Sequence, residues 1–228
     1  MLIILDRDGV INEDSDDYIK NPSEWVPIPD SLAAIAALNH AGHRVVIATN
    51  QSGIARGFYT EAQLHRIHQK MQQALAKMGG HIDGIFYCPH HPDDHCCCRK
   101  PKPGLLLQIA EKFNTDFTDA WMIGDALSDI ACAHAVNCGA ILVKTGKGMR
   151  TLMANGLQQY PDVPIFENLS DVVDTLKSSH SREDGNLEGP EERFLLQVFC
   201  SLIPAFASMT EKSARMERRV FLFFFCVF

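Results

Sequence analysis

Acidic side chains stand directly after apolar runs at two places in the chain, where they could share a divalent cation. The segment Asp6-Arg7-Asp8-Gly9 follows the apolar run Leu2–Leu5, and Asp125 follows Ala120–Ile123. Mg²⁺ prefers oxygen ligands and usually takes one or two protein carboxylates beside a substrate phosphate. A carboxylate can also attack phosphorus while a neighbouring carboxyl group moves protons. The pattern therefore predicts metal-assisted phosphoryl chemistry, although a DxD sequence alone fits a solvated acidic turn equally well.

Polar and basic residues suited to phosphate binding stand at two further places. Thr49 and Asn50 end an apolar run, and a glycine-containing loop, Gln51–Gly57, follows them. Such glycines free backbone N–H groups to face an anion. Arg99 and Lys100 stand just before a predicted helix, where Arg could clamp a phosphate and Lys could neutralise a transferring phosphoryl group. Taken singly, each segment also fits an ordinary polar surface loop.

The segment Tyr87–Gly104, YCPHHPDDHCCCRKPKPG, carries four cysteines and three histidines. Zn²⁺ in structural sites is held by four such ligands in a tetrahedron. In an extended chain, residues i and i+2 face the same side, which pairs Cys88 with His90 and Cys96 with Cys98. Because four protein ligands leave no position for water, we expect a structural Zn²⁺. A disulfide between Cys96 and Cys98 would be strained and would need an oxidising compartment.

Short apolar runs that alternate with helical patterns would position these groups. Strands are predicted at Leu2–Leu5, His43–Thr49, Asp83–Tyr87, Ala120–Ile123, Ala140–Val143 and Pro164–Phe166. Helices are predicted at 29–39, from Thr60 to about Met78 with Gln63 completing a capping box, from Pro103 to about Phe113, between the fourth and fifth strands, and near Leu169–Leu176. This alternation indicates a doubly wound α/β fold with a parallel sheet. Its ligands bind at the carboxyl ends of the strands, where the candidate groups stand.

Several other side chains have mainly structural interpretations. Asp129 is expected to cap the helix after Asp125, with a place in the outer shell of a metal as the alternative. His65 and His68 are expected to be a surface pair on the helix that follows Thr60. Cys132 and Cys138 stand in or just after an apolar helix, so we expect buried, inert thiols.

The 228-residue chain is long enough for one good-sized domain. Its net charge of -7 disfavours nucleic acid as a partner, and no apolar run reaches the ~18–20 residues that a membrane span needs. The start of the chain is too short and too acidic for a secretory signal. We therefore expect a cytoplasmic monomer with reduced cysteines. A catalytic domain is expected at residues 1–178, and a disordered or loosely packed extension at 179–228.

The motifs occur in an order that resembles the haloacid dehalogenase-type (HAD) phosphatase superfamily over about residues 1–178. DxDG is followed by Thr, then Lys, then GDxxxD, each after a strand or before a helix. The resemblance implies a Rossmann-like fold in which Asp6 is the nucleophile and Asp8 the general acid/base. It implies that Thr49 and Lys100 hold the phosphoryl oxygens. It also implies that Mg²⁺ is bound by Asp6, Asp125 and the backbone carbonyl of Asp8.

The intervals between these motifs are too short for a large inserted cap domain. About 40 residues separate Asp8 from Thr49, and about 50 separate Thr49 from Lys100. A helix and a few loops fill them, so we expect a capless, open site. Selectivity would then come from the loops Glu13–Tyr18 and Gln51–Gly57 and from the cysteine- and histidine-rich loop.

A narrower resemblance comes from DRDGVIN, TNQSGIARG, CPHHP and CxCRKPxPG, which look like the D-glycero-D-manno-heptose 1,7-bisphosphate 7-phosphatase family. It implies a small phosphorylated sugar as substrate, a role in nucleotide-activated heptose and lipopolysaccharide biosynthesis, and a zinc loop with the ligands named above. The expected substrate contacts are Asp14, Asp17, Tyr18, Asn50, Gln51, Ser52, Arg99 and Lys100. Ala126 departs from relatives that carry Lys after the fourth-motif Asp. Histidinol-phosphate phosphatase, which shares the zinc loop, is the alternative.

Overall fold

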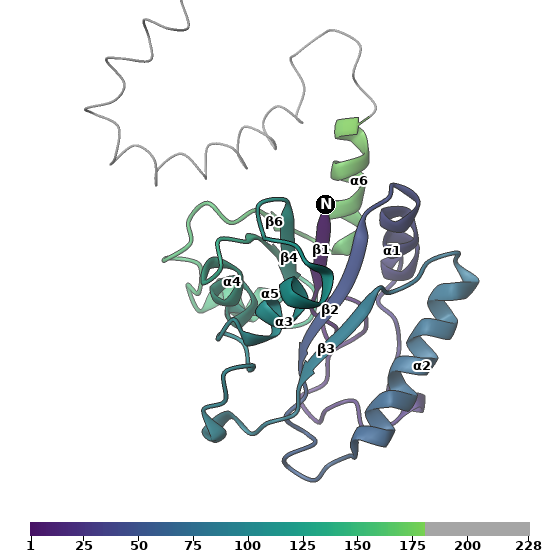
Figure 1. Ribbon diagram of the computed structural model, residues 1–228, viewed down its shortest axis with the longest axis vertical. Helices are drawn as coiled ribbons and strands as arrows, with labels where there is room; N and C mark the ends of the chain where they lie inside the picture. The colour runs from purple at the N-terminus through teal and green to yellow at the C-terminus, as the bar shows by residue number, and fades with distance from the viewer. Residues whose placement is uncertain (181–228) are drawn as a thin grey trace, which may run out of the picture. The chain divides into compact units, whose positions relative to one another are not determined.

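Six parallel strands form the centre of the fold and lie side by side in the order β3-β2-β1-β4-β5-β6 (Figure 1). The computed structural model describes residues 1–180, without the side chains of 178–180. The strands are β1 (Leu2–Leu5), β2 (Arg44–Asn50), β3 (Gly84–Cys88), β4 (Ala120–Gly124), β5 (Gly139–Val143) and β6 (Ile165–Phe166). Every predicted strand is present, with ends shifted by about one residue. The doubly wound parallel sheet is confirmed.

The strand order changes direction between β1 and β4. From β1 the chain passes through β2 to β3 on one side, and from β4 it passes through β5 to β6 on the other. Leu5 is in register with Ile123, and the backbone N–H of Asp6 donates to the carbonyl of Ile123 at 2.9 Å. Ligands of open α/β sheets bind at such a switch point. Asp6 and Asp125 follow these two strands, so the topology brings both acidic segments to one edge.

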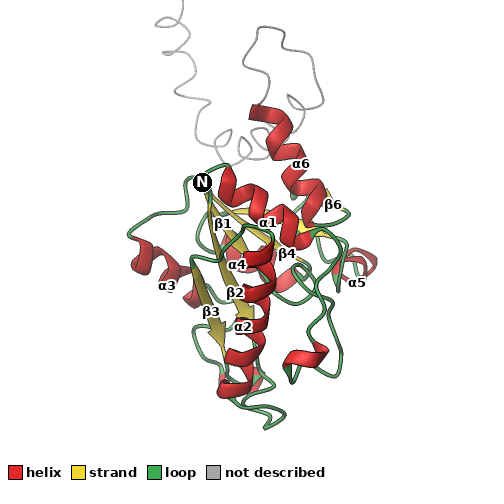
Figure 2. Ribbon diagram, turned by 90° about the vertical axis from the view of Figure 1, so that its right-hand side faces the viewer, coloured by secondary structure: helices red, strands yellow, loops and turns green. Residues whose placement is uncertain are grey.

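Helices cover both faces of the sheet (Figure 2). One face packs against α1 (Ser31–His40), α2 (Glu61–Lys77) and α6 (Leu169–His180), and the other against α3 (Gly104–Phe113) and α4 (Leu127–His134). Successive side chains of a strand point to opposite faces. Ile3 and Leu5 accordingly join the first core, whereas Leu2 and Ile4 join the second. A short helix, α5 (Gly148–Met153), follows β5 and was not foreseen.

The helix predicted from Thr60 has the expected start. The Thr60 hydroxyl accepts from the backbone N–H of Gln63 at 3.2 Å, and the Gln63 side chain accepts from the Thr60 N–H at 2.8 Å. The prediction that His65 and His68 form a surface pair on this helix is wrong for His68. His65 is exposed, but His68 is only 5% exposed and faces the interior. Helical spacing fixes which residues share a side, but not how wide the buried stripe is.

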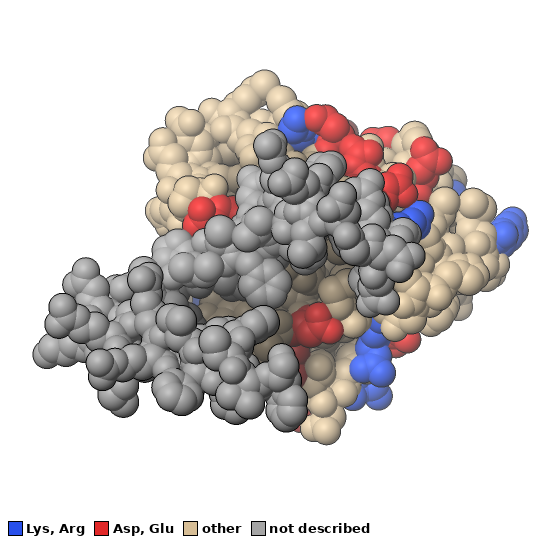
Figure 3. Space-filling model, turned by 90° about the horizontal axis from the view of Figure 1, so that it is seen from above, with Lys and Arg blue, Asp and Glu red and all other residues tan. Residues whose placement is uncertain are grey.

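The two cysteines near α4 are buried, as expected: Cys132 is inaccessible and Cys138 is 5% exposed. The extension expected at 179–228 lies outside the described residues, except for the backbone of its first two. Within residues 1–180, no helix is long and apolar enough to cross a membrane. On the face seen from above Figure 1, basic and acidic side chains lie next to one another (Figure 3).

Candidate active site

A cavity of about 320 Å³ opens at the carboxyl ends of β1, β2 and β4. It gathers most of the predicted site residues. Two predicted catalytic or substrate-binding residues are not part of the lining. Asp17, a predicted substrate contact, is exposed and lies outside it. Lys100 is buried and contacts the lining residue Asp6. The lining consists of Asp6, Asp8, Asp14, Ser15, Asp16, Tyr18, Ile19, Thr49, Asn50, Gln51, Ser52, Arg99, Asp125, Ala126, Ser128 and Lys147.

Three carboxylates lie together here: Asp6 and Asp125, which line the cavity, and Asp129, which is fully buried and does not line it. Oxygens of Asp6, Asp125 and Asp129 all lie within 4.8 Å of one another. Burial, followed by the charge of Asp6, raises the pKa of Asp125 to about 8. Burial likewise raises the pKa of Asp6 to about 6, although Lys100 opposes the shift. Such crowding of buried negative charge is relieved when a divalent cation binds, so the donor set fits Mg²⁺.

Asp129 has the capping role that we expected, together with a contact that we did not. One carboxylate oxygen accepts from the backbone N–H of Ala126 at 3.0 Å, at the start of α4. The other lies 2.7 Å from the ammonium group of Lys100. The fully buried Asp129 therefore helps to fix the position of the Lys100 ammonium group.

Lys100 is the buried cation next to the carboxylates of Asp6 and Asp129. Its ammonium group lies 3.1 Å from Asp6 and 2.6 Å from the carbonyl oxygen of Ala48. Burial opposes the charged form, but the carboxylates of Asp129 and Asp6 outweigh it and raise the pKa of Lys100. The Asn50 side-chain amide pairs with the backbone of Lys100 through two hydrogen bonds of 3.1 Å. Asn50, a predicted substrate contact, thus anchors the lysine loop.

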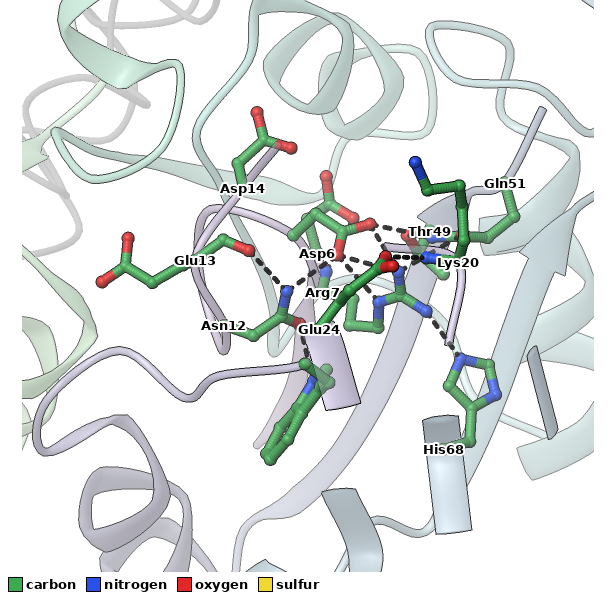
Figure 4. Close-up of polar contacts among 12 residues, drawn as sticks. Asp6, Arg7, Asn12, Glu13, Asp14, Lys20, Glu24, Thr49, Gln51 and His68 are labelled. Atoms are coloured by element: carbon green, nitrogen blue, oxygen red, sulfur yellow. Dashed lines mark hydrogen bonds and ion pairs between the residues drawn. The ribbon is translucent and has the colours of Figure 1, made fainter. Parts of the chain in front are cut away.

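Asp8 is held by several donors at the edge of the cavity. The guanidinium of Arg7 binds both of its oxygens, and the amides of Asn12 and Gln51 bind one oxygen each. Burial favours the neutral carboxyl group, but these donors, led by Arg7, outweigh it and lower the pKa of Asp8. Gln51 also donates to the Thr49 hydroxyl at 2.9 Å. Figure 4 shows Arg7, Asn12, Thr49 and Gln51 converging around this part of the site.

Residues after β5 complete the surroundings of Asp125 and were missed by sequence reasoning. The backbone N–H of Lys147 donates to Asp125 at 2.7 Å, and its ammonium group lies 3.0 Å from Asp14. Gly9 and Gly146 have φ values of +82° and +56°, and a Cβ at either would lie 2.0 or 2.2 Å from an Asp125 oxygen. The one available signal was the KTGKG sequence at a strand's carboxyl end.

A second cluster could hold a metal ion. Ligand atoms of Cys88, His90, Cys96 and Cys98 all lie within 4.8 Å of one another. The sulfur atoms of Cys88 and Cys96 are 3.5 Å apart, and the Cys98 sulfur is 3.2 Å from the His90 Nδ1. Tetrahedral Zn²⁺ with bonds of ~2.3 Å to sulfur places such sulfur atoms roughly 3.8 Å apart. Cys97 is exposed and lies outside the cluster. The four donors therefore suit one closed tetrahedral site.

Comparison with known proteins reveals close relatives. A family model described as HAD-hydrolase-like matches residues 97–172. The D-glycero-beta-D-manno-heptose-1,7-bisphosphate 7-phosphatase of Pseudomonas aeruginosa is 53% identical over 175 residues, which is 77% of this chain and 97% of the relative. The enzyme of the same name from Bordetella bronchiseptica is 49% identical, with the same coverage.

Solved structures of similar fold include phosphatases of the same kind. The crystal structure of D,D-heptose 1,7-bisphosphate phosphatase from B. bronchiseptica, complexed with magnesium and phosphate, aligns with a TM-score of 0.75 and 48% identity. That match covers 78% of this chain and 98% of the other. The corresponding phosphatase from Burkholderia thailandensis has a TM-score of 0.61 and 41% identity, with equal coverage.

Proposed function

Since the chain belongs to the D-glycero-beta-D-manno-heptose-1,7-bisphosphate 7-phosphatase family of HAD-type phosphatases, we propose that it removes the 7-phosphate of this sugar bisphosphate. The reaction is the hydrolysis of a phosphoric monoester. The observation that carries the proposal is identity of 53% over 97% of a relative's length, together with an acidic cavity at the switch point. The product would serve nucleotide-activated heptose and lipopolysaccharide biosynthesis.

The arrangement supports a two-step mechanism. A carboxylate oxygen of Asp6 attacks phosphorus, the bond from phosphorus to the sugar oxygen breaks, and Asp8, which must be in its protonated form for this step, donates that proton to the sugar oxygen. Water then attacks the aspartyl-phosphate, Asp8 takes its proton, and Asp6 and inorganic phosphate are released. The backbone N–H of Arg7 and the ammonium of Lys100 both bind one oxygen of Asp6, at 2.7 and 3.1 Å. These contacts orient the nucleophile.

The phosphoryl group would be held by Lys100 and Thr49. Lys100 lies at hydrogen-bond distance from Asp6, so its charge is placed where the transferring group accumulates negative charge. We assign the Mg²⁺ ligands to Asp6, Asp125 and the backbone carbonyl of Asp8. When bound, Mg²⁺ supplies neutralisation of phosphate charge.

We assign a structural Zn²⁺ to Cys88, His90, Cys96 and Cys98. The loop that carries them ends at Cys98, one residue before Arg99 and two before Lys100. Fixing Cys98 would therefore fix the direction in which both cations enter the site. Arg99 lines the cavity, which supports its assignment as a substrate contact.

The sugar would be contacted by loop residues around the cavity mouth. Asp14, Tyr18 and Ser52 line the cavity beside Arg99. Gln51 also lines it, but its amide already binds Asp8 and Thr49, so we assign Gln51 to positioning these two groups. Asp17 has an exposed side chain that lies outside the cavity lining, so we do not assign it a substrate contact.

Phosphate release with Mg²⁺ tests the proposal when heptose 1,7-bisphosphate and histidinol phosphate are compared at equal concentrations. We expect a higher kcat/KM for the heptose bisphosphate, and ³¹P NMR should show the 7-phosphate disappear while the 1-phosphate remains. Asp6→Asn should abolish release, because the amide cannot form the covalent intermediate. Preference for histidinol phosphate would overturn the substrate assignment, and unchanged release by Asp6→Asn would overturn the mechanism.

A further inference from the structure

The guanidinium of Arg7 occupies most of the hydrogen-bonding capacity of Asp8. Arg7 Nε lies 3.0 Å from Asp8 Oδ1, and Arg7 Nη2 lies 2.8 Å from each Asp8 oxygen. This two-pronged contact fixes the plane of the carboxylate as well as its position. Arg7 itself has no exposed surface, so solvent cannot orient it. The position of Asp8, which Asn12 and Gln51 also contact, therefore depends in part on what holds Arg7.

The other amino group of Arg7 is held by a residue far away in sequence. Arg7 Nη1 lies 3.3 Å from Nε2 of His68, which comes from α2 (Figure 4). Arginine offers only donors, so the histidine nitrogen must accept. The His68 ring is consequently neutral and carries its proton on Nδ1. Burial, and secondly the charge of Arg7, lowers the pKa of His68 to about 3, which keeps the acceptor available.

A second support reaches Arg7 from the loop after β2. Arg7 Nη2 also lies 3.3 Å from the Gln51 side-chain oxygen, which accepts from the hydroxyl of Tyr59 at 2.6 Å. Tyr59 is 4% exposed and His68 is 5% exposed. The guanidinium thus contacts Asp8, which lines the cavity, and the buried side chains of Gln51 and His68, of which His68 binds the amino group that does not contact Asp8. Loss of that contact would let the guanidinium tilt.

We propose that His68 is a positioning residue that holds Arg7 and thereby places Asp8 for proton transfer to the leaving sugar oxygen. This inference rests on the proposed function, in which Asp8 is the general acid/base. His68 touches neither substrate nor metal ligands in this scheme, and acts only through Arg7. Correct placement matters because a displacement of ~1 Å at a catalytic group can slow a reaction about a hundredfold.

The effect of His68 should depend on the leaving group. A sugar alkoxide is a poor leaving group and needs the proton from Asp8, whereas 4-nitrophenolate leaves without one. If only the Asp8 carboxyl group is misplaced, release of the sugar in the first turnover is slowed. The first-turnover burst of 4-nitrophenolate is then unchanged. A general distortion of the phosphate site slows both. The ratio of the two rates therefore separates positioning from folding.

The test compares His68→Gln with His68→Asn in full-length protein by rapid-quench kinetics on heptose bisphosphate and 4-nitrophenyl phosphate. The Gln oxygen can occupy the position of the histidine Nε2 and accept from Arg7, whereas Asn is too short to reach it. We expect Asn to slow sugar release by about ten- to a hundredfold with an unchanged nitrophenolate burst, and Gln to restore most of the loss. His65→Asn, on the exposed side of α2, is the matched control.

Equal losses with both substrates, or no loss in His68→Asn, would overturn the proposal. A wild-type protein that hydrolyses neither substrate would instead contradict the proposed function. Should His68→Asn not fold, ¹⁵N NMR of the wild-type histidine ring decides the question. A ring protonated on Nδ1 supports the arrangement, and a ring protonated on Nε2 rules out the hydrogen bond from Arg7.

Discussion

Asp125 is the residue at which three separate segments of the chain meet. Its side chain accepts from the backbone N–H of Lys147, its carbonyl accepts from the Thr151 hydroxyl, and the backbones of Gly9 and Gly146 pass close to it. The Asp125 carboxylate occupies the space that a Cβ atom at Gly9 or Gly146 would fill. Placement of this proposed metal ligand therefore depends on residues with no metal-binding chemistry of their own.

Replacement of Gly146 by alanine tests this dependence. The new Cβ would lie 2.2 Å from an Asp125 oxygen and 2.4 Å from the Gly9 Cα, at a φ of +56°. We expect Asp125 to be displaced and the Mg²⁺ concentration for half-maximal activity to rise by about tenfold or more, as for residues that orient metal ligands. Gly42→Ala is the control, because its φ is +78° but nothing lies within 4 Å of the new Cβ.

Gly42→Ala should lose about 1–2 kcal/mol of stability from the left-handed backbone, and Gly146→Ala should lose more because its Cβ also clashes with Asp125 and Gly9; urea unfolding measures both losses. Only Gly146→Ala should alter the Mg²⁺ dependence. If Gly42→Ala changes it equally, backbone strain rather than contact with Asp125 is responsible.

The buried, neutral state of His68 predicts how the free energy of unfolding changes with pH. Its pKa is about 3 in the folded protein against a usual value of 6.5. Above pH ~6.5 both states are neutral at this residue, so it contributes no pH dependence. As the pH falls below that value, the unfolded state binds a proton that the folded state excludes. The free energy of unfolding should therefore fall by up to about 1.4 kcal/mol per pH unit from this group.

Urea unfolding at pH 6.5, 5.5 and 5.0 measures this slope. His68→Gln removes the titrating ring, so its slope should be shallower than that of the wild type, while His65→Gln on the exposed side of α2 should keep the steep slope. Identical slopes for all three proteins would contradict the buried, neutral state of His68.

The sequence predicted the residues that stand directly after strands better than those that support them. Asp6 and Asp125 follow apolar runs and Thr49 ends one, and parallel topology alone brings all three to one edge of the sheet. Arg7 and His68 are 61 residues apart, and no local pattern links a residue in a βα loop to one face of a later helix. Their contact depends on how α2 packs against the sheet.

At the scale of elements, local signals determined most boundaries. The capping box at Thr60 starts α2, and the glycine at position 79, with φ +77°, follows its end. The helix α5 was missed because it has only six residues and no side-chain cap at its start. A helix so short depends on tertiary packing rather than on periodicity.

We propose that metal binding holds the loop between β3 and α3 in its conformation. It contains only a short 3-10 turn, Pro92–Asp94, and no other regular structure before α3. Cys98→Ser should release the proposed Zn²⁺, lower the melting temperature and reduce kcat, because a structural metal contributes directly to folding free energy. Cys97→Ser should retain the metal, since Cys97 is exposed and outside the cluster.

Elemental analysis of the purified proteins gives the metal content, and phosphate release gives kcat. We expect one zinc per chain in the wild type and in Cys97→Ser. Retention of zinc by Cys98→Ser together with its loss from Cys97→Ser would reverse the ligand assignment. A kcat that is unchanged after zinc loss would show that the loop places Arg99 and Lys100 without a metal.

At the scale of the whole molecule, the described residues account for a domain of the length found in relatives. The Pseudomonas aeruginosa phosphatase matches over 175 residues, which is 97% of that protein. Residues Met1–Ser181 form one compact unit with cores on both faces of the sheet. We therefore propose that a domain at about residues 1–178 contains the whole catalytic apparatus. That this domain acts as a monomer stays a separate prediction.

A shortened chain ending at His180 tests this proposal while keeping α6 entire. Leu169, Val172 and Val173 of α6 are buried against the sheet, so a cut before them would expose apolar core, whereas a cut after His180 leaves that core covered. We expect the shortened chain to keep the kcat/KM, zinc content and Mg²⁺ dependence of the full chain, and to have the mass of one chain in light scattering. A drop in kcat/KM with unchanged melting temperature would assign residues after His180 a part in the site. A drop in both would assign them a part in the fold, and the catalytic domain would then have to be drawn to include them.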